Sequence, residues 1–153
     1  MINIGIDFSL NSPGSCIETA DGQYKFITFF NYGNRIWDEE GKKIPKAFSV
    51  HNVFSTLFND DKVSIGLEGF SYGSKGNSFI DIIQYNTFLR KELIDKYSVE
   101  KLSIFQPSHV KKVAGKGNGN KHFMIKAFQD DVLNDKNLRS TKLWKWCKGK
   151  DFS

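Results

Sequence analysis

Two short apolar runs, each ending in an acidic residue, constrain the fold of this chain more than any other feature. The first run is Ile2–Asp7 and the second is Val63–Glu68. Both place isoleucine, valine or leucine at alternate positions, a pattern that predicts strands over residues 2–7 and 63–68. Strands so far apart in sequence can be neighbours in one sheet, which would bring Asp7 and Glu68 together at one edge.

The rest of the chain predicts an α/β domain. Strands at 15–20 and 24–31, joined by the hairpin dipeptide Asp21-Gly22, extend the first strand into a three-stranded antiparallel meander. Further elements are expected as a helix at 46–60, a helix from 78 to about Tyr97, a strand at 101–106, a helix at 108–114, and a last helix that follows the N-cap Asn120 and ends at Asn134. The face of the second helix that we expect to be buried carries Phe79, Ile82, Ile83, Asn86, Leu89, Leu93 and Tyr97.

Composition limits the class of protein. The 153 residues fit one domain, and the 14 phenylalanines predict a Phe-rich core. No apolar stretch approaches the ~20 residues that a membrane helix needs, so we expect a soluble, cytoplasmic protein without membrane contact. Cys16 and Cys147 form no metal-ligand pattern and are expected to be free thiols in a reducing compartment.

The charge balance indicates a polyanionic partner. There are 22 Lys and Arg residues against 17 Asp and Glu, which gives a net charge of +5. The segment 136–153 is the most basic, with six Lys or Arg residues, one acid, and the interleaved Trp144 and Trp146. It has two interpretations: an arm that contacts phosphates and stacks on bases, or a solvated basic tail.

Three blocks of sequence, in this order, carry a family resemblance. They are Gly5–Ser9, Leu67–Phe70, and Pro107–Lys112 followed by Gly115–Lys121. Together they resemble the RuvC-type Holliday junction resolvases of the ribonuclease H-like superfamily, and most closely the bacteriophage-encoded branch. The resemblance implies a five-stranded mixed sheet flanked by helices, a homodimer formed through the helix at 78–97, and Mg²⁺-dependent cleavage of branched DNA, in the host cytoplasm if the protein is phage-encoded.

The same resemblance assigns site residues. Asp7 and Glu68 would be the catalytic carboxylates and metal ligands, with Mg²⁺ as cofactor and Mn²⁺ as a substitute, because Mg²⁺ prefers oxygen ligands and paired ions can clamp both oxygens of a phosphodiester displacement. The residues expected to contact DNA are Phe70, Lys75, Lys111, Lys112, Lys116 and Lys121. Phe70 has two interpretations: a wedge that stacks on an unpaired base, or a plug of the core below its loop.

The chain departs from the family pattern at its C-terminal end. In the family, an acidic pair on a further helix completes the metal site, whereas this sequence ends at Ser153 within the basic segment. We therefore divide it into a nuclease domain at 1–135 and a C-terminal segment at 136–153 that stops before the last acidic helix. We expect these residues alone to cut junctions poorly, unless Asp131 or Asp135 takes the place of the missing ligands.

Two other functions compete with the nuclease. The first is a non-catalytic protein that binds branched nucleic acid on the same fold. The second is a sugar-kinase or actin-like ATPase, because Gly5–Ser9 followed by Ser12–Gly14 also resembles a phosphate loop. No second phosphate loop and no Gly-x₄-Gly-Lys-Ser/Thr motif is present, so we expect no nucleotide cofactor.

Overall fold

A computed structural model describes residues 1–9, 13–28, 62–70 and 77–150 of the chain. The expected helix at 46–60, the last residues of the expected strand at 24–31, and Lys75 lie outside these residues. None of the helices in the described part is both long and apolar enough to span a bilayer.

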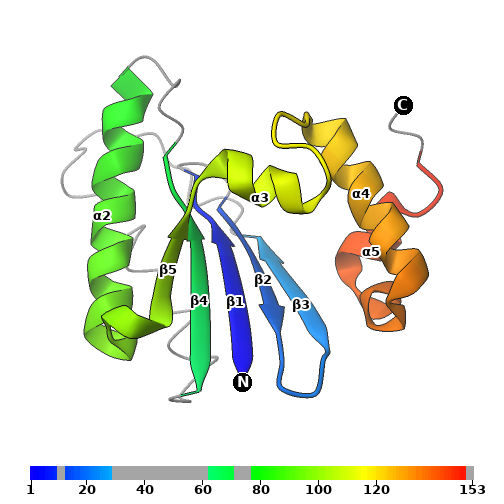
Figure 1. Ribbon diagram of the computed structural model, residues 1–153, viewed down its shortest axis with the longest axis horizontal. Coiled ribbons are helices and arrows are strands. Elements are labelled where there is room, and N and C mark those ends of the chain that lie inside the picture. The colour runs from blue at the N-terminus through cyan, green and yellow to red at the C-terminus, as the bar shows by residue number, and fades with distance from the viewer. Residues whose placement is uncertain (10–12, 29–61, 71–76, 151–153) are drawn as a thin grey trace.

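Five strands form one mixed sheet in the order β3-β2-β1-β4-β5 (Figure 1). Their bounds are β1 Ile2–Asp7, β2 Gly14–Glu18, β3 Tyr24–Thr28, β4 Val63–Glu68 and β5 Leu102–Phe105. The β1-β2 and β2-β3 pairs are antiparallel, whereas β1-β4 and β4-β5 are parallel. The three-strand meander, the two parallel strands and the flanking helices confirm the predicted fold class.

The core lies between one face of this sheet and the long helix α2, Asn77–Tyr97. Side chains alternate along each strand, so Ile4 and Ile6 of β1 point into the core while Gly5 and Asp7 lie on the other face. The residues that fill the core include Val63, Ile65, Leu67, Tyr85, Leu89, Leu93 and Tyr97, none more than 9% exposed.

The predicted buried stripe of the long helix was wrong in part. Tyr85, with 0% of its surface exposed, lies on the buried stripe of α2, whereas Ile82 and Ile83 are only half-buried. The helix therefore faces the sheet through the i+4 series of Tyr85, Leu89, Leu93 and Tyr97. Among the described residues Phe8 is the one buried phenylalanine, and the prediction of a Phe-rich core stays a prediction, because six of the 14 phenylalanines lie outside them.

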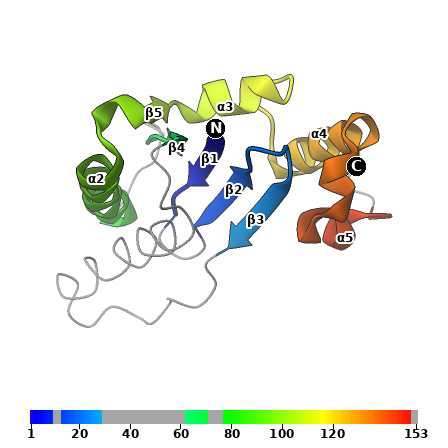
Figure 2. The ribbon, with the colours of Figure 1, turned by 90° about the horizontal axis from the view of Figure 1, so that it is seen from below.

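The helices that follow α2 lie at the carboxyl end of β5 and beyond the outer strand β3 (Figure 1). The elements are the 3₁₀ turn η1 Val99–Lys101, α3 Pro107–Val113, α4 Lys121–Asn134, the 3₁₀ turn η2 Lys136–Ser140, and α5 Lys142–Cys147. Viewed from below, α2 lies near the β5 end of the sheet and α4 and α5 lie beyond β3 (Figure 2). The predicted N-cap of α4 is confirmed, because the side chain of Asn120 accepts a hydrogen bond from the backbone N–H of Phe123 at 2.9 Å.

The described part of the basic segment, residues 136–150, is folded. Leu138, Thr141 and Cys147 are buried, and the Thr141 hydroxyl caps α5 by accepting a hydrogen bond from Trp144 N–H at 3.2 Å. A long-range contact joins this segment to the β2-β3 hairpin, where the Asn137 side-chain amide donates to the carbonyl of Gly22 at 2.8 Å. Residues 136–150 are thus part of the domain surface rather than a free tail. Cys16 and Cys147 are free thiols, as predicted.

Candidate active site

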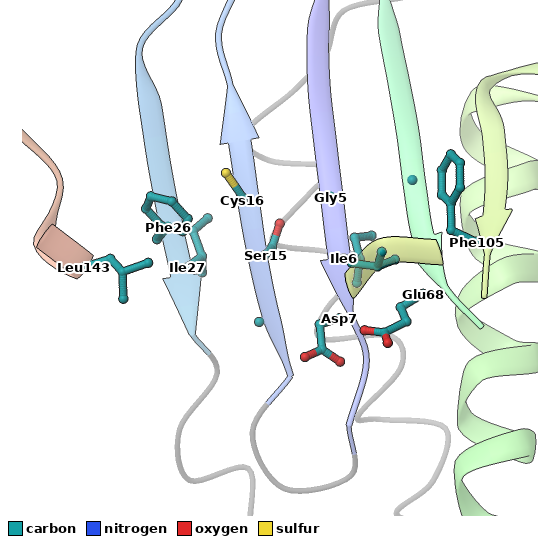
Figure 3. A pocket seen from close by; sticks show the side chains of 13 residues that line it. Gly5, Ile6, Asp7, Ser15, Cys16, Phe26, Ile27, Glu68, Phe105 and Leu143 are labelled. Carbon is teal, nitrogen blue, oxygen red and sulfur yellow. The ribbon is translucent and has the colours of Figure 1, made fainter. Parts of the chain in front are cut away.

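Asp7 and Glu68 meet at one edge of the sheet, as the two apolar runs predicted. They end the parallel strands β1 and β4, in which Ile6 lies opposite Leu67, so the two acids follow at the same level. Both project from the face of the sheet opposite α2, because each comes one position after a buried core residue. Figure 3 shows the two carboxyl groups side by side.

The pKa values of both carboxyl groups are raised, chiefly because each is partly withdrawn from water. The pKa of Glu68 is raised by loss of hydration, by repulsion from Asp7 and by a hydrogen bond with it, although the charge of Lys111 opposes the shift. The pKa of Asp7 is raised by loss of hydration, while the hydrogen bond from Glu68 and the charge of Lys121 act in the opposite direction.

This pair of carboxylates fits a divalent, hard cation. Without metal, two partly desolvated acids of like charge face each other, and a cation would relieve their repulsion. Mg²⁺ and Mn²⁺ prefer such oxygen ligands, and Mg²⁺ commonly uses only one or two protein carboxylates. Asp7 and Glu68 are therefore the residues that could hold a metal ion.

Two of the four predicted lysines in the α3-α4 region lie close enough to influence the acids. Lys111 is on α3 and borders a pocket with Asp7 and Glu68. Lys121 is the first residue of α4 and lowers the pKa of Asp7 by its charge. Positive charge from two different helices thus reaches the same edge of the sheet.

The other two lysines are exposed in and before the glycine-rich loop. Lys112 is near the end of α3, and Lys116 is in a turn in which its N–H donates to the carbonyl of Lys111 at 3.3 Å. Gly117 packs against the start of α3, since a Cβ there would lie 3.2 Å from the Ser108 carbonyl oxygen. The loop is therefore folded back on α3. The side chain of Lys116 is exposed to solvent beside this helix.

Phe70 packs against protein side chains. Its ring centroid lies 6.5 Å from that of Phe79 in an edge-to-face arrangement, and the Arg90 guanidinium carbon lies 4.9 Å from its centroid. The residue is half-buried, and it borders two shallow pockets, one of which also contains Asp7 and Glu68. In this arrangement Phe70 plugs the space between the sheet edge and α2.

The acids of α4 do not join the pair. Asp130 and Asp131 line a separate pocket with Val113 and Phe123. The carboxylate of Asp135 caps η2 by accepting a hydrogen bond from Asn137 N–H at 2.9 Å. Within the described ranges no cluster of three or more metal-binding side chains occurs, so Asp131 and Asp135 do not complete the site there.

An apolar hollow of about 440 Å³ adjoins the carboxylates on the open face of the sheet. Gly5 and Gly66 lie opposite each other in its floor, two residues before Asp7 and Glu68 respectively. A Cβ at Gly66 would lie 3.1 Å from the Phe105 ring, so the glycine leaves room for that ring. The remaining lining is mostly apolar and includes Val110. Cys16, Phe26 and Leu143 also belong to it, as Figure 3 shows.

The paired glycines and Phe105 were not identified from sequence as part of the site surroundings. The repeated spacing, glycine two residues before the acid in both strands, is the signal that could have revealed Gly5 and Gly66. Phe105 gives no comparable signal, because it becomes a neighbour only through the pairing of β5 with β4.

Comparison with solved structures places this architecture in the ribonuclease H-like fold of the RuvC type. The chain superposes on a Thermus thermophilus RuvC structure with a TM-score of 0.61 and 10% identity, over 95% of this chain and 96% of the other. It superposes on T. thermophilus RuvC in complex with Holliday junction substrate with a TM-score of 0.59 and 12% identity, over 85% and 78% of the two chains. The yeast mitochondrial Holliday junction resolvase Ydc2 gives a TM-score of 0.54 and 14% identity, over 97% and 68%.

Searches by sequence identify no relatives of this kind. No family model matches the chain, and no curated protein matches it significantly. At 10–14% identity the structural similarity shows the fold. The function must therefore be argued from the site.

Proposed function

We propose that the protein is a structure-selective DNA endonuclease that cuts four-way or branched junctions, with Mg²⁺ held by Asp7 and Glu68. The observation that carries the proposal is the position of these two coupled carboxylates at one edge of a ribonuclease H-like sheet, with Lys111 and Lys121 beside them. The similarity to a resolvase that was solved with a Holliday junction substrate supports branched DNA as the substrate.

Each residue has a distinct task in the proposed reaction. The bound metal would supply Lewis-acid activation of a water and stabilisation of the leaving oxygen. Asp7 and Glu68 would hold it in their deprotonated forms, so the raised pKa values of the two acids make protonation compete with metal binding. Lys111 and Lys121 attract the phosphate and offset the negative charge of the acids, so that a polyanion can approach this edge.

The exposed groups around this edge would position the DNA. We assign contacts with the phosphate backbone to Lys112 and Lys116, which are exposed, and to Lys75. Phe70 could stack on a base at the crossover only if its ring left its contacts with Phe79 and Arg90. The plug interpretation of Phe70 therefore has the structural support, and the wedge requires a rearrangement.

Substitution Asp7→Asn tests this proposal. It removes a metal ligand, while the side chain keeps its size, so we expect cleavage of a labelled four-way junction in Mg²⁺ or Mn²⁺ to be abolished and junction affinity to stay within about threefold of the wild type. Asp130→Asn is the matched control, because it neutralises an exposed acid in a separate pocket. Equal loss of binding and cleavage in Asp7→Asn would contradict a metal-ligand role.

A non-catalytic junction-binding protein is the second candidate function. It is favoured by one observation: among the described residues only two carboxylates meet at the site. A site with so few ligands is expected to bind Mg²⁺ weakly and to cut slowly. Junction-selective affinity without nicking in Mg²⁺, Mn²⁺ or Co²⁺ would establish this function in place of the nuclease.

We further propose, on the family resemblance alone, that the enzyme belongs to the bacteriophage branch, acts in the host cytoplasm and works as a homodimer through α2. A dimer would present two sites to the paired strands of a junction. Light scattering of the purified protein measures this directly, and a monomer that still nicks both strands would exclude the dimer.

A further inference from the structure

Outside the carboxylate site, exposed basic side chains of the described residues gather on α5 and the turn that follows it. Between Lys136 and Lys150 the sequence has six basic residues and no acid. We use the name α5 basic face for the exposed side chains of this region, which are Lys142, Lys145, Trp146, Lys148 and Lys150.

Helix geometry separates this face from the packed side of α5. Cys147 is 0% exposed, and Leu143 and Trp144 are half-buried, so these residues attach the helix to the domain. Lys142, Lys145 and Trp146 are spaced i, i+3 and i+4 and therefore share the outer side. Trp146 is 52% exposed and lies on this outer side with the lysines.

The backbone of this region is held in place. The side-chain amide of Gln129 on α4 donates to the carbonyls of Cys147 at 3.0 Å and Lys150 at 3.2 Å. Gly149 has φ 76°, a left-handed conformation that turns the chain after α5. As a result the Lys150 ammonium lies 3.9 Å from the Trp146 ring centroid, over its face.

The charges of the α5 basic face are available to a partner. No ion pair joins Lys142, Lys145 or Lys148 to any acid in the part of the chain that the structure describes. Arg139 differs, since its guanidinium donates to the carbonyls of Val132 and Leu133 at the end of α4 and so has a structural role. Unneutralised lysines presented from a fixed helix suit a partner with closely spaced negative charges.

We propose that the α5 basic face binds the sugar-phosphate backbone of a DNA arm, outside the junction centre. This inference rests on the proposed function for the identity of the nucleic acid. α5 lies beyond β3, at the end of the sheet opposite α2 (Figures 1 and 2). Its inner residue Leu143 borders the hollow that also contains Asp7 and Glu68. An arm that leaves the carboxylate edge toward β3 therefore passes the α5 basic face, where Lys142, Lys145 and Lys148 contact phosphates.

The test compares two triple variants with equal loss of charge. Lys142→Gln, Lys145→Gln and Lys148→Gln are combined in the first. The control combines Lys62→Gln, Lys96→Gln and Lys101→Gln, which lie at the starts of β4 and β5 and the end of α2, at the opposite end of the sheet from the acids. Dissociation constants for a labelled four-way junction and for a linear duplex are measured in EDTA over a series of salt concentrations, with thermal melting to verify folding.

Each phosphate contact contributes roughly 0.9 to the slope of log K against log salt concentration. We expect the α5 triple variant to lower this slope by roughly 2–3 on both DNAs, and the control to change it by less than about 0.5. A second α5 variant, with arginine at the same three positions, keeps the charges and is expected to keep the slope. Junctions with shortened arms should remove the difference between the α5 variant and the wild type.

The possible failures are distinguishable. A wild-type slope in the α5 triple variant, with junction binding intact, would overturn the assignment of this face and leave the proposed function standing. A lowered slope on duplex and junction alike, without preference for the junction, would support the face and contradict junction selectivity. A wild-type protein that binds neither DNA would overturn both proposals.

Discussion

Asp7 and Glu68 end neighbouring parallel strands at the same level, and partial burial raises the pKa of both carboxyl groups. A carboxyl group binds a metal ion in its deprotonated form, and a raised pKa makes that form harder to reach. Protonation and metal binding therefore compete at this edge. The first two predictions follow from that competition.

Asp7→Asn should stabilise the metal-free protein at neutral pH. The folded-state pKa values of Asp7 and Glu68 are raised above their usual 3.8 and 4.5. Their contribution to stability is therefore present below these usual values and is lost as the pH rises through the raised folded-state values. At pH 7 in EDTA we expect the variant to melt about 1–3 °C above the wild type, with the difference vanishing at low pH. A lower melting temperature than the wild type at pH 7 would contradict the repulsion between the acids.

Divalent ions should raise the melting temperature of the wild type above that of Asp7→Asn. Mn²⁺ bound to Asp7 and Glu68 stabilises only the folded state, by about 2.7 kcal/mol at 100 times the dissociation constant, which corresponds to a rise of several degrees in Tm. Asp7→Asn and Glu68→Gln should lose this rise, whereas Asp130→Asn, in its separate pocket, should keep it. The readout is thermal melting against Mn²⁺ concentration, and an equal rise in all four proteins would locate the ion elsewhere.

Gly119→Ala should destabilise the loop that positions Lys121. A Cβ at Gly119 would lie 2.4 Å from Cδ1 of Phe123, so the buried glycine allows the aromatic ring to fold over the start of α4. We expect a loss of about 1–3 kcal/mol in urea unfolding. Gly5→Ala is the matched control, because its Cβ would meet only the Cys16 carbonyl oxygen at 3.8 Å. Equal losses of unfolding free energy in the two variants would show that the contact with Phe123 does not cause the destabilisation of Gly119→Ala.

Phe70→Ala should lower stability, because the ring packs against Phe79 and Arg90. Half-burial reduces the usual cost of removing a phenylalanine to about 1–2 kcal/mol. Phe70→Leu should recover most of the stability. Leucine has no aromatic face, so Phe70→Leu would fail to recover junction affinity if the Phe70 ring of the wild type stacks on a base. An unchanged unfolding free energy in Phe70→Ala would exclude the plug.

Much of this fold could be predicted because local signals agreed with the final structure. The apolar runs of β1 and β4 have the predicted bounds, and Asp21-Gly22 joins β2 to β3 as expected, with φ 78° at the glycine. The Asn120 cap fixed the start of α4. In each case the residues that determine the element are adjacent in sequence, so no tertiary information was required.

What could not be predicted depends on contacts between distant segments. α5 has only six residues, and it is held by Gln129 of α4 and by packing around Cys147. The lysines of this segment predict an exposed arm or tail, so neither contact could be inferred from its sequence. Tyr85 was missed because its polar hydroxyl obscures its place in the stripe of α2. The approach of Lys111 and Lys121 to the acids likewise follows from the path of the chain across the sheet edge.

The hydrogen bond from the Asn137 amide to the Gly22 carbonyl spans 115 residues of sequence. During synthesis, the β2-β3 hairpin leaves the ribosome long before its partner does, because chains emerge at ~5–20 residues per second. Until Asn137 arrives, the tip of this hairpin lacks its hydrogen bond at the Gly22 carbonyl. Completion of the fold is therefore a late event in translation, and slower elongation over η2 would prolong the interval in which β3 can pair with another chain.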